Sequence, residues 1–199
     1  MTVAEPLKIA GELTNDPAMC NFHVNREIAH GWTLIFESPE DGRGSPLIDR
    51  LFEVDGVARV LIQDKTISLT KNIPAPWPHL AASIAQAIRN GFLDDQPPIA
   101  AAVIDELQNA PMDGVEEEIA ELFEDHINPA LASHGGYVRL IKIEDRDVFV
   151  EMGGGCQGCA SSKATMRYGV ETAIRRIAPQ VRKIIDATDH AAGVNPFYK

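Results

Sequence analysis

The chain has 199 residues, 45% of them hydrophobic, and a formal charge of −11 at pH 7. This length allows one large domain or two small ones, each with a buried core. The acidic balance argues against nucleic acid and anionic membrane surfaces as partners, because both reward an excess of Lys and Arg. No apolar run is long enough to cross a bilayer, and residues 1–11 lack the pattern of a secretory signal, so we expect a cytoplasmic protein that binds no membrane.

Prolines divide the chain near its middle. The tandem Pro97-Pro98 breaks helix and sheet alike, and residues 99–108 favour at most a short helical turn. We therefore predict an N-terminal domain at 1–95, a linker at 96–112 and a second domain at 113–199.

Alternating and helical hydrophobic patterns predict mixed α and β structure in both domains, so the expected fold class is α+β with two small domains. In the first domain Ser45-Pro46 opens a short helix, because Pro suits the first helical position. The predicted elements, in the order ββαββα, are strands at 22–28 and 32–36, a helix at 46–52, strands at 57–62 and 67–69, and a helix at 77–92.

The second domain has the predicted order αββαβ. Apolar residues at helical spacing begin at Val115, with Asp113 as the N-cap, and Pro129 is expected to kink or end this helix. The remaining predicted elements are strands beginning at 138 and at 148, a helix that follows residue 159 and ends before Pro179, and a short strand at 181–186.

Cys156 and Cys159 form a Cys-x-x-Cys pair between the strand that begins at 148 and the helix that follows it. Amide groups and the dipole of the first helical turn stabilise negative charge there, which favours the metal-binding thiolate. Glycines flank the pair, at 153, 154, 155 and 158, where the chain must turn sharply and approach a bulky ligand. This combination is a stronger signal than Cys-x-x-Cys alone, and it predicts that both cysteines are metal ligands.

Two thiolates complete neither a tetrahedral metal site nor a cubane cluster, since both usually take four ligands. Cys20 lies in the other domain and could supply only one further ligand, and the histidines are scattered along the chain. The simplest source of further ligands is symmetry, in which two subunits each give Cys156 and Cys159 to a cluster on the dimer axis.

Residues 113–199 resemble the C-terminal domain of NifU, the Nfu-type iron–sulfur assembly module. The stretches that carry this resemblance are Asn128-Pro129-Ala130-Leu131, His134-Gly135-Gly136, the loop from Gly153 to Cys159, Gly169-Val170-Glu171 and Asp186-Ala187-Thr188-Asp189-His190. The first half is similar to the N-terminal domain of Nfu proteins, although Cys20 departs from the family's pattern. Its matching stretches are Asn15-Asp16-Pro17 with Phe22, Ser45-Pro46-Leu47, Leu51-Phe52, Gly56-Val57 and Trp77.

The resemblance implies a 4Fe–4S cluster held between the subunits of a homodimer by Cys156 and Cys159 of each. It further implies a scaffold or carrier that works with upstream cluster assembly machinery and transfers the cluster to recipient apoproteins. Such a carrier needs no catalytic acid or base, so we expect no enzyme activity.

Other interpretations of the same residues remain open. Cys156 and Cys159 are also consistent with a zinc site, with a thiol–disulfide oxidoreductase, or with a reduced pair that binds nothing. Cys20 is interpreted as a small apolar or surface residue rather than a ligand. A group of basic residues is interpreted as a solvated helix face or, alternatively, as a surface that docks a recipient: Arg167, Arg175, Arg176, Arg182 and Lys183.

Overall fold

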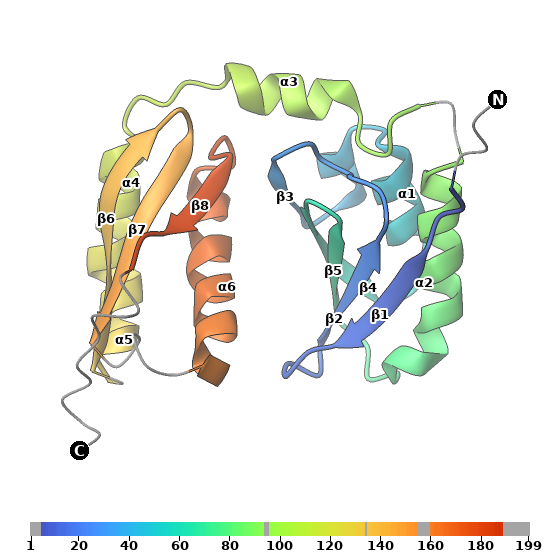
Figure 1. The fold of residues 1–199 in the computed structure, drawn as a ribbon, viewed down its shortest axis with the longest axis horizontal. Helices are drawn as coiled ribbons and strands as arrows, with labels where there is room; N and C mark the ends of the chain where they lie inside the picture. The colour runs from blue at the N-terminus through green and yellow to red at the C-terminus, as the bar shows by residue number, and fades with distance from the viewer. Residues whose placement is uncertain (1–4, 94–95, 134, 155–159, 189–199) are drawn as a thin grey trace. The chain divides into compact units, whose positions relative to one another are not determined.

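The protein folds into two compact units, Met1–Asn109 and Ala110–Lys199, which both combine helices and strands (Figure 1). The computed structural model describes residues 5–93, 96–133, 135–154 and 160–188. The predicted fold class, α+β with two small domains, is confirmed. Among the described residues, no helix combines the length and the apolar character that a membrane span requires.

The first unit contains an antiparallel five-stranded sheet in the order β1-β2-β5-β4-β3, with α1 and α2 packed against one of its faces (Figure 1). Its elements are β1 (Ile9–Leu13), β2 (Met19–Val24), β3 (Thr33–Phe36), a 3-10 turn (Pro39–Gly42), α1 (Pro46–Phe52), β4 (Val57–Gln63), β5 (Thr66–Lys71), α2 (Trp77–Gly91) and α3 (Ala101–Asn109). The predicted order ββαββα is found from β2 to α2.

Hydrophobic periodicity explains how this unit buries its core. Along β2 every second residue is buried, and Phe22 and Val24 point to the same side as the helices because strand side chains alternate between faces. Along α2 the buried residues Ile84 and Ile88 recur at helical spacing. Gly91 lets α2 approach α1 closely, since a Cβ atom there would lie 2.6 Å from the Cα atom of Leu47.

Strand β1 is an element that the sequence analysis did not predict. It pairs with β2 at the edge of the sheet, in a register that sets Leu13 opposite Cys20. Four of its five residues are exposed, so the strand shows no alternation of apolar and polar residues. It is held through its backbone, and backbone hydrogen bonding leaves no hydrophobic pattern in the sequence.

The segment after the tandem prolines belongs to the first unit, so the connection between the units is shorter than the predicted linker at 96–112. The backbone N–H of Leu47 donates a hydrogen bond to the carbonyl of Pro98 at 3.1 Å. The N–H of Ala100 donates to the hydroxyl of Ser45 at 2.9 Å. Val103 of α3 is buried in the same core.

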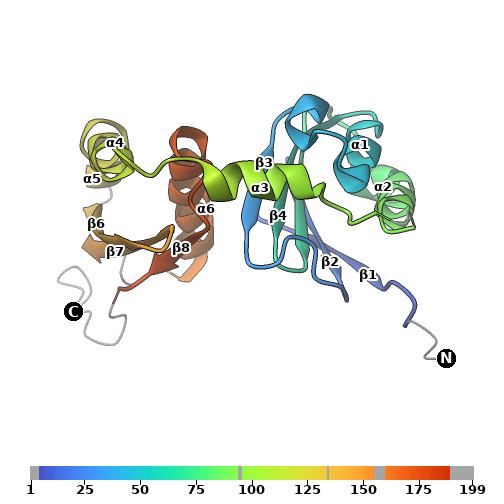
Figure 2. The ribbon, with the colours of Figure 1, turned by 90° about the horizontal axis from the view of Figure 1, so that it is seen from above.

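The second unit contains the three-stranded sheet β6-β7-β8, in which β6 and β7 are antiparallel and β7 and β8 are parallel. Its elements are α4 (Val115–Leu122), a π-helical turn (Phe123–Ile127), α5 (Asn128–Ala132), β6 (Gly136–Glu144), β7 (Asp147–Gly154), α6 (Ala160–Ile177) and β8 (Lys183–Asp186). Helices α4, α5 and α6 lie on the same side of this sheet (Figure 2). The order αββαβ agrees with the prediction.

Two details of the first helix of this unit differ from the prediction. The N-cap is Gly114, with φ +79°, and not Asp113. The π-helical turn separates α4 from α5, and its last hydrogen bond runs from the N–H of Asn128 to the carbonyl of Phe123. Pro129 therefore lies in the first turn of α5, where a backbone N–H group would have no partner within the helix.

Replacing Gly91 with Ala is expected to destabilise the first unit by about 1–3 kcal/mol, because the new methyl group must displace the backbone of α1. Both tryptophans, Trp32 and Trp77, lie in this unit, so their fluorescence during urea unfolding reports on it alone. The matched control is Ser83→Ala, which makes a favourable helical substitution at an exposed position of α2. A midpoint for Gly91→Ala equal to that of the control would refute the close packing.

Candidate metal centre

The predicted metal loop connects the end of β7 to the start of α6. Cys156 and Cys159 themselves lie outside the described residues, as do His134 and His190. The described structure ends at Gly154 on one side of the loop and resumes at Ala160 on the other. The prediction that the loop joins a strand to a helix is confirmed. The described part of the site consists of the elements on either side of the loop.

Gly153 and Gly154 form the stem from which the loop leaves the sheet, and both lie in close contact with the neighbouring segment at β6. A Cβ atom on Gly153 would lie 2.0 Å from Cζ of Tyr137, the residue directly opposite in the pairing of β6 with β7. A Cβ atom on Gly154, which has φ +64°, would lie 2.0 Å from the carbonyl oxygen of Gly135. Gly154 is therefore required by its backbone conformation and by the backbone beside it, whereas a side chain at Gly153 would have to displace the ring of Tyr137.

Thr188 continues the hydrogen bonding of β7 beyond the end of β8. Its buried hydroxyl accepts a hydrogen bond from the N–H of Met152 at 2.8 Å, and its own N–H donates to the carboxylate of Asp186 at 3.0 Å. Met152 directly precedes the glycine stem, so this bond fixes the strand just before the loop. The sequence analysis gave Thr188 no role, because its partner is 36 residues away and no local pattern indicates the contact.

Asn128 fixes the neighbouring strand in a similar way. Its side-chain carbonyl accepts a hydrogen bond from the N–H of Val138 at 2.8 Å, and its amide group donates to the carbonyl of the same residue at 3.0 Å. One side chain thus satisfies both backbone groups of Val138 on β6. Val138 follows Tyr137, so both strands of the stem are fixed within two residues of the glycines.

Arg175 fixes the far end of α6 from inside the protein. The residue is 4% exposed, and its guanidinium donates to the carboxylate of Glu171 at 3.2 Å and to the carbonyl of Val181 at 2.7 Å. Burial lowers the pKa of Arg175, and the negative charge of Glu171 opposes this shift. The interpretation of the basic group as a solvated helix face is wrong for Arg175, which is buried because the backbone carbonyls after α6 need its donors.

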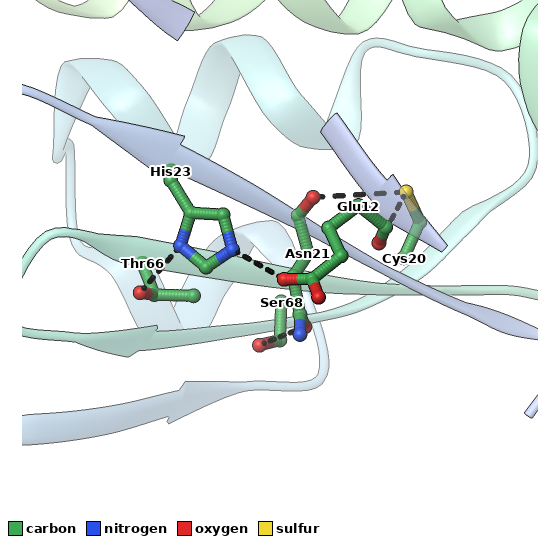
Figure 3. A network of polar contacts seen from close by, with 6 residues as sticks. All are labelled: Glu12, Cys20, Asn21, His23, Thr66 and Ser68. Atoms are coloured by element: carbon green, nitrogen blue, oxygen red, sulfur yellow. Dashed lines mark hydrogen bonds and ion pairs between the residues drawn. The ribbon is translucent and has the colours of Figure 1, made fainter. Parts of the chain in front are cut away.

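Cys20 lies in the first sheet, within a network of polar contacts on β1, β2 and β5 (Figure 3). Its thiol is buried and donates a hydrogen bond to the carbonyl of Glu12 at 3.3 Å. The carboxylate of Glu12 pairs with Nε2 of His23 at 2.9 Å, and Nδ1 of His23 lies 3.1 Å from the hydroxyl of Thr66.

Burial raises the pKa of the Cys20 thiol, which favours its neutral form over the thiolate that binds metal. Within the described residues there is no group of three or more His, Cys, Asp and Glu side chains that could hold a metal ion. The structure therefore fits the interpretation of Cys20 as a small apolar residue and offers no alternative metal site in its described part.

Replacing Thr188 with Val should leave the N–H of Met152 buried without an acceptor and destabilise the second unit by about 1–3 kcal/mol. The sensitive measurement is hydrogen exchange of the Met152 amide by NMR, which should accelerate by at least tenfold. Thr188→Ser keeps the hydroxyl and serves as the control. Equal exchange rates in the Val and Ser variants would show that the hydroxyl does not hold the strand.

Comparison with known proteins gives matches to two family models, which cover most of the chain. Residues 119–185 match the NifU-like domain, and residues 9–95 match the domain described as the scaffold protein Nfu/NifU N terminal. A solution NMR structure of a NifU-like protein from Saccharomyces cerevisiae matches with a TM-score of 0.37 and 14% identity, over 42% of this chain and 76% of that one.

Curated relatives carry the name Fe/S biogenesis protein NfuA. The protein from Ruthia magnifica subsp. Calyptogena magnifica is 42% identical over 91 residues, which make up 45% of this chain and 46% of the relative. The protein from Acinetobacter baylyi is 35% identical over 94 residues, or 45% of this chain and 44% of the relative. The chain thus spans about half the length of the curated relatives it matches. The two domain matches occur in the order of the predicted domains. Together with these relatives, they show that the chain belongs to the Nfu-type family of NifU-like proteins.

Proposed function

We propose that the chain is an iron–sulfur cluster scaffold and carrier, in which two copies hold a 4Fe–4S cluster through Cys156 and Cys159 of each and pass it to apoproteins. The main support is the position of the Cys-x-x-Cys pair, between the end of β7 at Gly154 and the start of α6 at Ala160, which offers two thiolates close to a helix N-terminus. The curated relatives are named as Fe/S biogenesis proteins, which supports the same class of cargo.

The donor set fits an iron–sulfur cluster shared between two copies. Thiolates are the ligands that such clusters take, and a 4Fe–4S cluster takes four of them. One chain offers Cys156 and Cys159, while Cys20 is buried in the other unit with its thiol hydrogen-bonded. A second copy supplies the missing pair most simply, because an isologous contact needs only one patch per chain.

Helix α6 supports the binding of an anionic cargo at this loop. It has 18 residues and begins at Ala160, directly after Cys159. The N-terminal end of a helix carries partial positive charge and free amide donors, which stabilise thiolates and the net negative cluster. Thr188 and Asn128 fix β7 and β6 beside the strand end from which the loop departs, which would give the thiolates a defined attachment on that side.

A carrier must also release its cargo. A cluster held between two copies at the end of a sheet can pass to an acceptor by exchange of one thiolate at a time, without a catalytic acid or base. On this proposal the chain is not an enzyme, and its partners are a second copy, apo iron–sulfur proteins and upstream assembly machinery. The first unit carries 15 of the chain's 29 acidic residues and would serve in recognition of acceptors.

Replacing Cys156 or Cys159 with Ser should abolish the cluster, because the shared site then has only two thiolates. Cys20→Ser is the control and should retain it. Anaerobic reconstitution followed by iron and sulfide analysis and visible spectroscopy measures the outcome, with about one 4Fe–4S cluster per two chains expected for the unmodified protein. A brown, cluster-loaded Cys156→Ser protein would refute the proposal, and stoichiometric zinc without sulfide would assign a zinc site instead.

A shortened chain that begins at Ala110 corresponds to the second compact unit and should still assemble the cluster. Its transfer of the cluster to acceptors should be slower than that of the full chain, and to different degrees for different acceptors, if the first unit recognises them. Cluster content and transfer rates to several apoproteins are the measurements. Failure of the shortened chain to assemble a cluster would mean that the two units share the site.

A further inference from the structure

The pairing of β6 with β7 ends, beside the cysteine loop, in two residue pairs that contain almost no side chains. Gly136 pairs with Gly154 in the last pair, and Tyr137 pairs with Gly153 in the pair before it. Contacts between side chains on neighbouring strands stabilise a sheet, whereas glycine contributes none and loses the most backbone freedom on folding. Tyr137 therefore supplies the one side chain among these four positions.

The ring of Tyr137 lies across β7 at Gly153. Both residues point away from the core, because their neighbours Val138 and Met152 pack into it. The three atoms nearest to a Cβ position on Gly153 are Cζ of Tyr137 at 2.0 Å, followed by its Cε1 and its hydroxyl oxygen at 2.3 Å. Gly153 is buried although it points outward, and Tyr137 is only 45% exposed. The ring thus occupies the place of the missing side chain, as aromatic residues do when they cover a glycine on a neighbouring strand.

Loss of this contact would move the point at which β7 is fixed. Met152 is held independently, since its N–H donates to the hydroxyl of Thr188 at 2.8 Å. Without the ring, the two glycines that follow Met152 have no side chain packed across the strand pair. The connection between the fixed part of β7 and Ala160 would then lengthen from residues 155–159 to residues 153–159. Fixing each added residue again when a ligand binds costs a factor of about 5–30 in affinity.

We propose that Tyr137 is a positioning residue for the cysteine loop. Its ring, packed over Gly153, keeps β7 ordered up to the residue from which the loop departs, and so slows the loss of the bound cluster. This inference rests on the proposed function, because that proposal assigns Cys156 and Cys159 as the ligands. Tyr137 acts through the strand that carries the loop and not through a bond to the cluster.

The test compares Tyr137→Thr with Tyr137→Phe in the full chain after anaerobic reconstitution. Threonine favours strands but is too short to cross Gly153, whereas phenylalanine keeps the ring. Tyr137→Thr should lose its cluster to an excess of a ferrous chelator at least about fivefold faster than the unmodified chain, and Tyr137→Phe at the unmodified rate. Ile141→Ala is the matched control and should leave the rate unchanged, because Ile141 lies on the same strand with the same exposed fraction.

Two further measurements separate positioning from a general loss of stability. In the chain without cluster, hydrogen exchange measured by NMR should accelerate in Tyr137→Thr at the amide of Gly153, which lies under the ring, and not at Val150 in the core. The visible circular dichroism of the bound cluster, which reports on the protein geometry around it, should change in Tyr137→Thr and be restored in Tyr137→Phe. Gly153→Ala tests the same contact from the other strand, since its Cβ atom would displace the ring, and it should also release the cluster faster.

Cluster loss from Tyr137→Thr at the rate of Ile141→Ala would overturn the proposal. Loss from Tyr137→Phe as fast as from Tyr137→Thr would overturn it too, because the hydroxyl and not the ring would then be responsible. If Tyr137→Thr does not fold, an unchanged rate in Gly153→Ala refutes the proposal. An unmodified chain that takes up no cluster contradicts the proposed function itself, while exchange at Gly153 still reports on the strand end, so the two failures are distinguished.

Discussion

The contact between the ends of β6 and β7 is the constraint on which the candidate metal centre depends. At Gly153 and Gly154 the neighbouring strand occupies the space that a Cβ atom would need. The stem is therefore defined by packing inside one unit and does not wait for a ligand to order it. A site built in this way keeps the elements that present it whether or not a ligand is bound, which is what the proposed carrier role would need.

Polar side chains distant in the sequence hold the two strands of this stem and the far end of α6 in place. Thr188 hydrogen-bonds β7 from beyond β8, Asn128 hydrogen-bonds β6 from the start of α5, and Arg175 ties α6 to the chain that follows it. Each is a polar side chain that satisfies backbone groups, so replacement by an apolar residue leaves buried donors or acceptors unpaired. The strand ends beside the loop are thus held by side chains from elsewhere in the same unit.

The sequence predicted those features whose cause is local. Alternation along Phe22 and Val24 and Pro46 at a helix start each have a short-range physical reason, and the elements they predict are present. The position of the cysteine pair between a strand and a helix was predicted in the same way, from the patterns on either side of it. Strand β1 was missed because an edge strand is held by its backbone, which any residue supplies. The burial of Arg175 was missed because helical spacing gives a residue's direction and not what packs over it.

The π-helical turn at Phe123–Ile127 lets this region hold one residue more than a regular helix of the same rotation. Its bond from the N–H of Asn128 to the carbonyl of Phe123 spans five residues, one more than in a regular α-helix. Because the turn is wider, its five residues rotate the chain about as far as four residues of a regular α-helix. A deletion of one residue here would convert the turn to regular helix and leave Asn128 directed at Val138, whereas replacement of Asn128 itself would remove both of its bonds to that residue. Among related chains, a one-residue change in length should therefore be tolerated at this turn more readily than a change of Asn128.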